Sequence, residues 1–193
     1  MNPSIIDLAV SAALKVLKEG GVILYPTDTI WGIGCDATNE EAVRRVFEIK
    51  RRSEAKSLVL LACDLDMVAR YIKEIPGMAI DLVEVNDAPM TIVYPGAHYL
   101  APGVVAEDGS VGIRIPLEDG FCRQLVRKLR RPLVSTSANI SGEPAPEGFR
   151  EISEEIKSAV DYVVPASLGA GATGRASQII KIGLRGEVEI IRK

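Results

Sequence analysis

Short apolar runs that alternate with amphipathic stretches constrain the fold of this chain more than any other feature. The apolar runs lie at residues 22–25, 58–61, 90–93 and 111–115. They are too short for buried helices, so they predict strands in a protein interior. The amphipathic stretches lie at residues 5–17, 42–47 and 65–72. Their apolar residues recur at helical spacing, so the alternation predicts an α/β fold with a mixed sheet.

The second half of the chain adds more strands than helices. We predict helices at 78–85, 121–129 and 149–159, and strands at 133–134, 162–164, 178–182 and 188–191. No repeat or low-complexity linker interrupts the 193 residues, and this length is typical of one domain. We therefore expect a single α/β domain over residues 1–193, with a mixed sheet flanked by helices.

Cysteine usage and charge argue against several classes of protein. Cys35, Cys63 and Cys122 are widely spaced and His98 is the only histidine, so a Cys/His zinc site is not expected. An odd number of cysteines without a signal peptide predicts reduced thiols and a cytoplasmic location. The net charge of −3 does not favour a general nucleic-acid binder. No apolar run approaches the roughly 20 residues of a membrane span.

The first candidate site is the polar segment that follows the first predicted strand. Thr27 and Thr29 offer hydroxyl groups to a ligand. Gly32 and Gly34 permit tight turns or the close approach of a ligand. Ligands of α/β sheets gather just beyond strand ends, which favours a site here. The alternative is a polar turn that side-chain hydrogen bonds of Asp28 stabilise.

The second candidate is a cluster of cations at the end of a predicted helix. Lys50, Arg51 and Arg52 follow one another, and Lys56 lies close behind. An arginine presents a planar fork to two oxygens and a lysine presents a point charge, so this segment suits a phosphate clamp. The alternative is a solvated helix end, because cations stabilise a helix C-terminus without any ligand.

Two further features favour binding of a polar ligand. Ser135, Ser137 and Asn139 lie in a polar segment directly after an apolar strand. Packing gives few reasons for such a cluster, whereas loops on a rigid scaffold commonly carry binding sites. Arg114 interrupts an otherwise apolar strand. It either faces water or, if it faces a cleft, adds a phosphate contact.

Residues 169–174 match the pattern G-x-G-x-x-G, but their context differs from a dinucleotide site. A predicted strand follows them, whereas the dinucleotide fingerprint opens a helix, so we reject a Rossmann-type site. We interpret the segment as a mobile glycine-rich lid with Arg175 at its edge. No Walker A sequence occurs, so any ATP site is not of the P-loop type.

The order of these motifs resembles the YrdC-like family of threonylcarbamoyl-AMP synthases. The residues that carry the resemblance are Pro26, Thr27, Asp28, Thr29, Gly32, Gly34, Lys50, Arg52, Val111, Gly112, Ile113, Arg114, Ile115, Pro116, Ser137, Ala138, Asn139, Ser141, Gly142 and Ser177. The resemblance implies a twisted mixed β-sheet flanked by helices, with a large concave basic cavity. It also implies an L-threonylcarbamoyladenylate synthase, a nucleotidyltransferase. Such an enzyme makes the adenylate and pyrophosphate from L-threonine, bicarbonate or CO2, and ATP with Mg²⁺.

The resemblance further implies a role for each matching residue. Lys50 and Arg52 would be catalytic and would contact the threonine carboxylate and the phosphates. The substrate-binding residues would be Thr29, Thr91, Ser137 and Asn139. The nucleotide-binding residues would be Lys50, Arg52, Arg114, Ser135, Ser137, Asn139 and Ser177. No residue is expected to hold a metal of its own.

The implied product serves the t6A modification of adenosine 37 in tRNA, with separate proteins making the transfer. Two alternatives remain open. One is a module of the same fold that binds tRNA or double-stranded RNA without this catalysis. Its surface would comprise Arg44, Arg45, Lys50, Arg51, Arg52, Lys56, Arg123, Arg127, Lys128, Arg130 and Arg131. The other is a different carbamoyl or adenylate reaction in the same cavity, because residues 53–58 depart from the usual family sequence.

Overall fold

The computed structural model describes residues 3–52, 58–118 and 120–193, and these form a mixed α/β fold around one sheet. The sheet has nine strands in the order β7-β1-β2-β6-β3-β5-β4-β8-β9. The strands are β1 (Ile23–Pro26), β2 (Trp31–Gly34), β3 (Val59–Leu61), β4 (Met90–Tyr94), β5 (Val111–Arg114), β6 (Leu133–Ser137), β7 (Tyr162–Val163), β8 (Gln178–Ile182) and β9 (Val188–Arg192). The pairs β1–β7, β3–β5 and β4–β8 are parallel. The other neighbouring pairs are antiparallel, which confirms the predicted mixed sheet.

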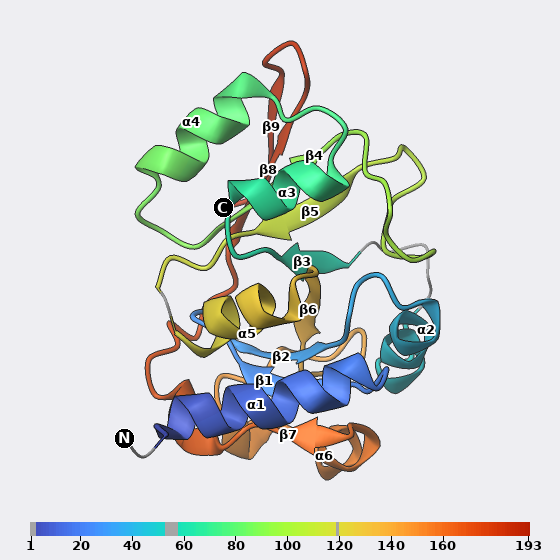
Figure 1. Cartoon of the computed structure of the whole chain (residues 1–193), viewed down its shortest axis with the longest axis vertical. Coiled ribbons are helices and arrows are strands. Elements are labelled where there is room, and N and C mark those ends of the chain that lie inside the picture. Colours follow the sequence, from blue (N-terminus) through green and yellow to red (C-terminus); the bar gives the residue numbers. More distant parts are fainter. Residues whose placement is uncertain (1–2, 53–57, 119) are drawn as a thin grey trace.

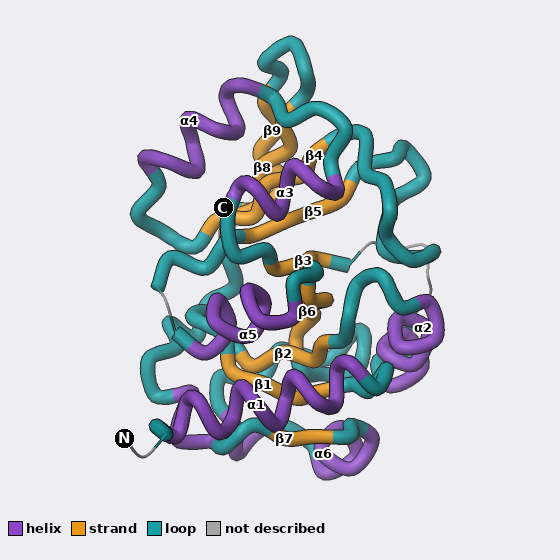
Figure 2. Tube along the Cα trace, in the orientation of Figure 1, coloured by secondary structure: helices purple, strands orange, loops and turns teal. Residues whose placement is uncertain are grey.

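Helices flank this sheet, as the periodicity of the sequence predicts. They are α1 (Ile5–Lys18), α2 (Glu40–Ile49), α3 (Leu65–Tyr71), α4 (Gly77–Val85), α5 (Phe121–Leu129) and α6 (Glu154–Ala159). In Figure 1, α3 and α4 lie over the end of the sheet that contains β4 and β8, and α1 and α5 lie over the end that contains β1 and β2. Long loops connect β4 to β5 and β6 to α6 (Figure 2).

Local side-chain chemistry fixes where several helices begin. The Ser4 hydroxyl accepts from the backbone N–H of Asp7, and the Asp7 carboxylate accepts in return from the Ser4 backbone, forming a capping box on α1. The side chains of Asn39 and Asp64 each accept from one backbone N–H at the start of α2 and α3, those of Ala42 and Met67. Such caps satisfy backbone donors that a helix start otherwise leaves without a partner.

Three predicted elements differ from the structure. Residues 31–34 form strand β2 between β1 and β6 instead of a loop. A Cβ at Gly34 would lie 2.2 Å from the Val134 carbonyl oxygen and 2.7 Å from the Tyr25 ring, so this glycine serves close packing inside the sheet. Strand β6 extends through Ser137. The helix expected at 149–159 is a 3-10 turn, Phe149–Glu151, followed by α6, which Ser153 caps.

Strand alternation divides the central sheet into an apolar face and a pocket face. Leu60, Ile92 and Ile113 are buried in the hydrophobic core, and register places Ile113 beside both of the others. Their chain neighbours Thr91 and Arg114 are paired in register and line a pocket. Because successive side chains of a strand point to opposite faces, the apolar residues that stabilise the sheet also aim these polar groups into the pocket.

Candidate functional site

The pocket lies on the central strands and has a volume of about 370 Å³. Most of the residues predicted for the site line it, although they come from six separate parts of the chain. These are Thr29, Arg52, Thr91, Arg114, Ser135, Ser137 and Ser177. The sheet register accounts for this convergence, because β3, β4, β5, β6 and β8 lie side by side. Residues 53–57 of the cationic segment, including Lys56, lie outside the described residues.

Arginines and hydroxyl groups give the pocket its polar character. Arg52, Arg114 and Arg192 are the charged residues in its lining, and none of the described lining residues is Asp or Glu. Burial lowers the pKa of Arg52, which still leaves a guanidinium charged at neutral pH. Planar guanidinium groups together with serine and threonine hydroxyls are the donors that phosphate and carboxylate groups require. The lining therefore suits a ligand with several negative charges.

Lys50 lies beneath the pocket and does not line it. Its side chain is 1% exposed. Its ammonium group donates to the main-chain oxygen of Ser137 and, at 2.7 Å, to that of Asn139. Burial and the nearby charge of Arg52 lower the pKa of Lys50 to about 8. In this structure Lys50 therefore ties the end of α2 to the turn after β6.

Asn139 belongs to the same turn, and its side chain also contacts main chain. The carboxamide nitrogen donates to the carbonyl oxygens of Ile140 at 3.1 Å and Glu143 at 2.7 Å. The Ser141 N–H donates to the Lys50 carbonyl oxygen at 2.9 Å, a second connection between α2 and the turn. Lys50 and Asn139 thus shape the segment that carries Ser137, while contact of either residue with a ligand stays a prediction.

The loop between β1 and β2 is held by Thr27. Its hydroxyl oxygen accepts from the backbone N–H groups of Thr29 at 3.0 Å and Ile30 at 3.1 Å. The same hydroxyl donates to the Ile30 carbonyl oxygen at 2.7 Å. The polar turn suggested by the sequence is therefore present, but Thr27 stabilises it. The Asp28 carboxylate instead forms an ion pair with Arg114, which is 4% exposed.

Thr91 and Ser177 form a buried hydroxyl pair in the pocket lining. Their oxygens lie 2.8 Å apart, and the residues are 0% and 7% exposed. Thr91 comes from β4, and Ser177 immediately precedes the parallel strand β8. A hydroxyl can donate and accept at once, so this pair can hydrogen-bond a ligand without leaving a buried group unsatisfied.

Arg192 of β9 lines the pocket, although the sequence did not single it out. It donates to the Ser177 carbonyl oxygen through Nε at 2.9 Å and Nη2 at 2.7 Å. No local motif marks Arg192, because the pairing of β9 with β8, and of β8 with β4, brings it to the site. Trp31, the only tryptophan, could be expected to pack against a ligand or in the core. It lines the pocket, is 3% exposed, and packs against Phe149 with ring centroids 4.9 Å apart.

The glycine-rich segment runs beside the loop that carries Thr29. Strand β8 follows it, which confirms that it does not open a helix. The N–H of Thr173 donates to the Asp28 carbonyl oxygen at 3.0 Å, and that of Gly174 donates to the Thr29 carbonyl oxygen at 2.8 Å. Arg175 is exposed and is not part of the pocket lining. Lid motion of this segment stays a prediction.

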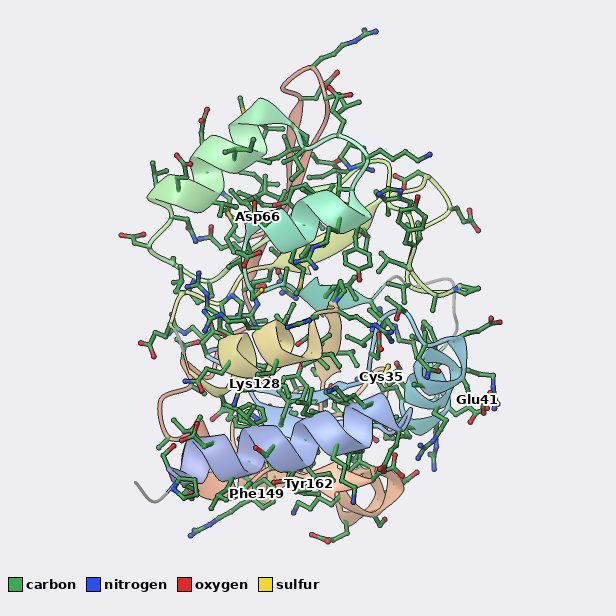
Figure 3. The ribbon with its side chains drawn as sticks, in the orientation of Figure 1. Cys35, Glu41, Asp66, Lys128, Phe149 and Tyr162 are labelled. Atoms are coloured by element: carbon green, nitrogen blue, oxygen red, sulfur yellow. The ribbon has the colours of Figure 1, made fainter. Side chains whose placement is uncertain are left out.

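Several cations of the alternative RNA surface are engaged in ion pairs. Arg44 pairs with Glu48 and with Glu41, and Glu41 lies on the outer side of α2 (Figure 3). The other pairs are Arg45–Asp161, Arg51–Glu155 and Arg131–Asp36. These pairs reduce the charge that this surface offers to a phosphate backbone.

Within the described residues, no group of three or more His, Cys, Asp or Glu could hold a metal ion. None of the helices in the described part of the chain combines the length and the hydrophobicity of a membrane span.

Fold and pocket together define a class: a mixed α/β protein whose central strands present an arginine- and hydroxyl-lined pocket. Comparison with known proteins assigns the family. A model of the Sua5/YciO/YrdC domain, described as telomere recombination, matches residues 15–193. Threonylcarbamoyl-AMP synthase of Pseudomonas aeruginosa (strain UCBPP-PA14) is 33% identical over 161 residues, which cover 81% of this chain and 84% of that protein. The chain therefore belongs to the Sua5/YciO/YrdC family.

Solved structures agree with this assignment. Sua5 of P. abyssi in complex with L-threonine has a TM-score of 0.83 at 25% identity, and the match covers 94% of this chain. The chain spans 52% of the length of that protein. YciO of E. coli has a TM-score of 0.79 at 20% identity, covering 100% of this chain and 91% of that one. At that identity the YciO match supports the fold, a single sheet flanked by helices.

Proposed function

We propose that this protein is an L-threonylcarbamoyladenylate synthase that forms threonylcarbamoyl-AMP and pyrophosphate from L-threonine, bicarbonate or CO2, and ATP. The observation that carries the proposal is the convergence of Arg52, Arg114 and the β6 serines on one pocket. This pocket occurs in a chain that is 33% identical to a protein named threonylcarbamoyl-AMP synthase. The arginines of the lining also support the basic cavity implied by the sequence.

The proposed nucleotide subsite comprises Arg52, Arg114, Ser135 and Ser137, with Ser177 at its border. Two guanidinium groups can each hold two phosphate oxygens, and the serine hydroxyls add directional donors. ATP enters as its Mg²⁺ complex, so the metal belongs to the substrate. Lys50 and Asn139 support this subsite by holding the turn after β6.

The proposed threonine subsite comprises Thr29 and Thr91, hydroxyl residues of the lining that come from the β1–β2 loop and from β4. The Thr29 hydroxyl lies 2.8 Å from that of Thr27, and the Thr91 hydroxyl lies 2.8 Å from that of Ser177. Both hydroxyls are therefore held in place before a ligand arrives, which reduces the entropy lost on binding. The P. abyssi relative was solved with L-threonine bound, which supports an amino-acid subsite in this fold.

The proposed chemistry depends on position and charge. The threonine amine attacks CO2 and releases a proton, giving a carbamate. A carbamate oxygen then attacks the α-phosphorus of ATP, and the bond to the β-phosphate oxygen breaks to release pyrophosphate. Arg52 and Arg114 offset the charge on the reacting groups. Orientation of the carbamate against the phosphorus can contribute on the order of 7–11 kcal/mol.

A covalent cysteine mechanism finds no support in the structure. Cys35 and Cys122 are buried, and burial raises the pKa of both thiols, that of Cys122 to about 12. A thiolate is the nucleophilic form, and these groups stay protonated at neutral pH. In the proposed role, the adenylate passes to separate proteins that modify adenosine 37 of tRNA in the cytoplasm.

Incubation with ATP, bicarbonate and each amino acid in turn, followed by mass analysis for the adenylate, tests the proposal. We expect pyrophosphate release that depends on threonine, and a preference for threonine over serine of about 1 kcal/mol or more from its extra methyl group. Adenylate formation with another amino acid would identify a related reaction. Salt-sensitive binding of double-stranded RNA or tRNA without pyrophosphate release would instead favour the RNA-binding module.

A further inference from the structure

The buried ion pair between Asp28 and Arg114 separates two cavities. Arg114 lines the substrate pocket, whereas Asp28 lines a second cavity of about 300 Å³ on the other side of the β1–β2 loop. Arg114 is 4% exposed and the Asp28 side chain 20%. The carboxylate therefore contacts the guanidinium from behind, away from the volume that a ligand would occupy.

The position of this carboxylate is fixed by the main chain around it. The Asp28 carbonyl oxygen accepts from Thr173 at 3.0 Å, which ties the loop to the glycine-rich segment. On either side of Asp28, the hydroxyls of Thr27 and Thr29 lie 2.8 Å apart. A carboxylate can orient its ion-pair partner when hydrogen bonds restrict the backbone of the loop that carries it.

The guanidinium keeps free donor capacity while it contacts Asp28. Its Nη1 donates to Asp28 Oδ1, and its Nη2 lies 3.4 Å from the Thr29 hydroxyl oxygen, a weak contact. A guanidinium carries five N–H donors in a fixed plane. One firm bond to Asp28 sets the orientation of this plane and leaves other donors for an anion in the pocket.

We propose that Asp28 is a positioning residue that holds Arg114 in the orientation used to bind the substrate phosphates or carboxylate. This inference rests on the proposed function and adds a residue that does not touch the substrate. Asp28 also supplies the counter-charge that a buried arginine needs when the pocket holds no anion, because a buried charge without a partner is strongly destabilising.

A double-mutant cycle tests the proposal. Asp28→Asn keeps the shape of the side chain and removes its charge, and Arg114→Gln removes the guanidinium. We expect each single variant to lower kcat/KM for threonine-dependent pyrophosphate release by about tenfold or more. We expect the double variant to be no worse than Arg114→Gln alone, because Asp28 acts only through Arg114. Multiplicative losses, or normal activity of Asp28→Asn, would overturn the proposal.

Two further variants separate positioning from a loss of folding. Asp108→Asn removes an exposed ion pair with Lys181 outside the pocket and should leave activity unchanged. Asp28→Glu keeps the charge but displaces the carboxylate. It should therefore lower activity in the natural protein and have no further effect in a protein that already carries Arg114→Gln. If Asp28→Glu lowers activity equally in both backgrounds, Asp28 has only a structural role.

The same cycle can be followed by ATP titration, using the fluorescence of Trp31, the only tryptophan and a lining residue. A natural protein that binds ATP but forms no adenylate would contradict the proposed function. If the effects of the Asp28 and Arg114 substitutions on ATP affinity are not additive, the positioning role would still be upheld. Additive changes in affinity would reject it, so the two failures are distinguishable.

Discussion

Replacing Lys50 with methionine tests whether this lysine supports the pocket from beneath. Methionine keeps an unbranched apolar side chain but cannot donate to the main-chain oxygens of Ser137 and Asn139, which Lys50 holds. The turn after β6 then loses a connection to α2. A displacement of about 1 Å in a positioned group can cost on the order of a hundredfold in rate. We therefore expect a loss of this size in threonine-dependent pyrophosphate release.

The fold should survive this change because two effects oppose each other. Each buried carbonyl oxygen left without a donor costs roughly 1–3 kcal/mol. The pKa of Lys50 is lowered from 10.5 to about 8, so removing its buried ammonium returns roughly 3 kcal/mol at neutral pH. With two such oxygens, the free energy of unfolding should therefore change by between a gain of about 1 kcal/mol and a loss of about 3 kcal/mol.

The lost hydrogen bonds and the removed buried charge can be distinguished by raising the pH. Because the pKa of Lys50 is about 8 in the folded state and 10.5 as its ordinary value, the unfolded state binds more protons between these two pH values. This group therefore makes the free energy of unfolding of the natural protein rise with pH across that window. Below about pH 8, the buried ammonium of Lys50 lowers the free energy of unfolding by its full amount. The variant lacks this titration, so its stability deficit should grow by roughly 2 kcal/mol between about pH 8 and 9.5.

Denaturant unfolding of both proteins at about pH 7, 8 and 9.5 measures this deficit. Other titrating groups are common to the two proteins and cancel in the difference. Lys73→Met, at an exposed lysine, is the matched control and should show neither the pH-dependent deficit nor the loss of activity. A deficit that stays constant across this pH range, or normal turnover by Lys50→Met, would show that Lys50 does not hold the turn in this way.

Two other variants follow from the site and the sheet. Arg192→Gln should raise KM for ATP about tenfold, because it removes a cation from the pocket lining. Steady-state kinetics check this, with the exposed Arg185→Gln as control, and an unchanged KM would show that Arg192 does not stabilise the bound nucleotide. Gly34→Ala should lower the free energy of unfolding by about 3 kcal/mol or more, because its Cβ would overlap the Val134 carbonyl oxygen. Urea unfolding measures it against Gly148→Ala, where a Cβ meets nothing within 4 Å, and equal stability of the two variants would contradict the packing argument.

The residues predicted from sequence as site residues were largely those that adjoin apolar strands. Ser135, Thr91 and Arg114 stand next to residues that must be buried, and strand alternation then forces the polar neighbours to the opposite face. This link is local and explains why the polar residues share one face, but the sequence left Arg114 open between water and a cleft, and Thr91 was expected only from the family resemblance. Thr29 was predictable for a related reason, since it follows directly on a buried strand.

Features that depend on non-local packing were beyond the sequence. Residues 31–34 were interpreted as a loop because glycines usually mark turns, whereas Gly34 is needed where Tyr25 and the β6 main chain meet the strand. Arg192 reaches the pocket only because β9 pairs with β8, and β8 with β4. Lys50 was predicted to belong to a phosphate clamp or to a solvated helix end, and its burial against the turn after β6 depends on the packing of α2, which no local pattern encodes.

In the proposed enzyme, one pocket holds the triphosphate and the amino acid together. A crystal structure with a non-hydrolysable ATP analogue and L-threonine would show both ligands at once. We expect phosphate oxygens within hydrogen-bonding distance of Arg52, Arg114 and Ser137, with threonine between Thr29 and Thr91. A nucleotide bound outside this pocket, with its phosphates remote from both arginines, would rule out the shared pocket.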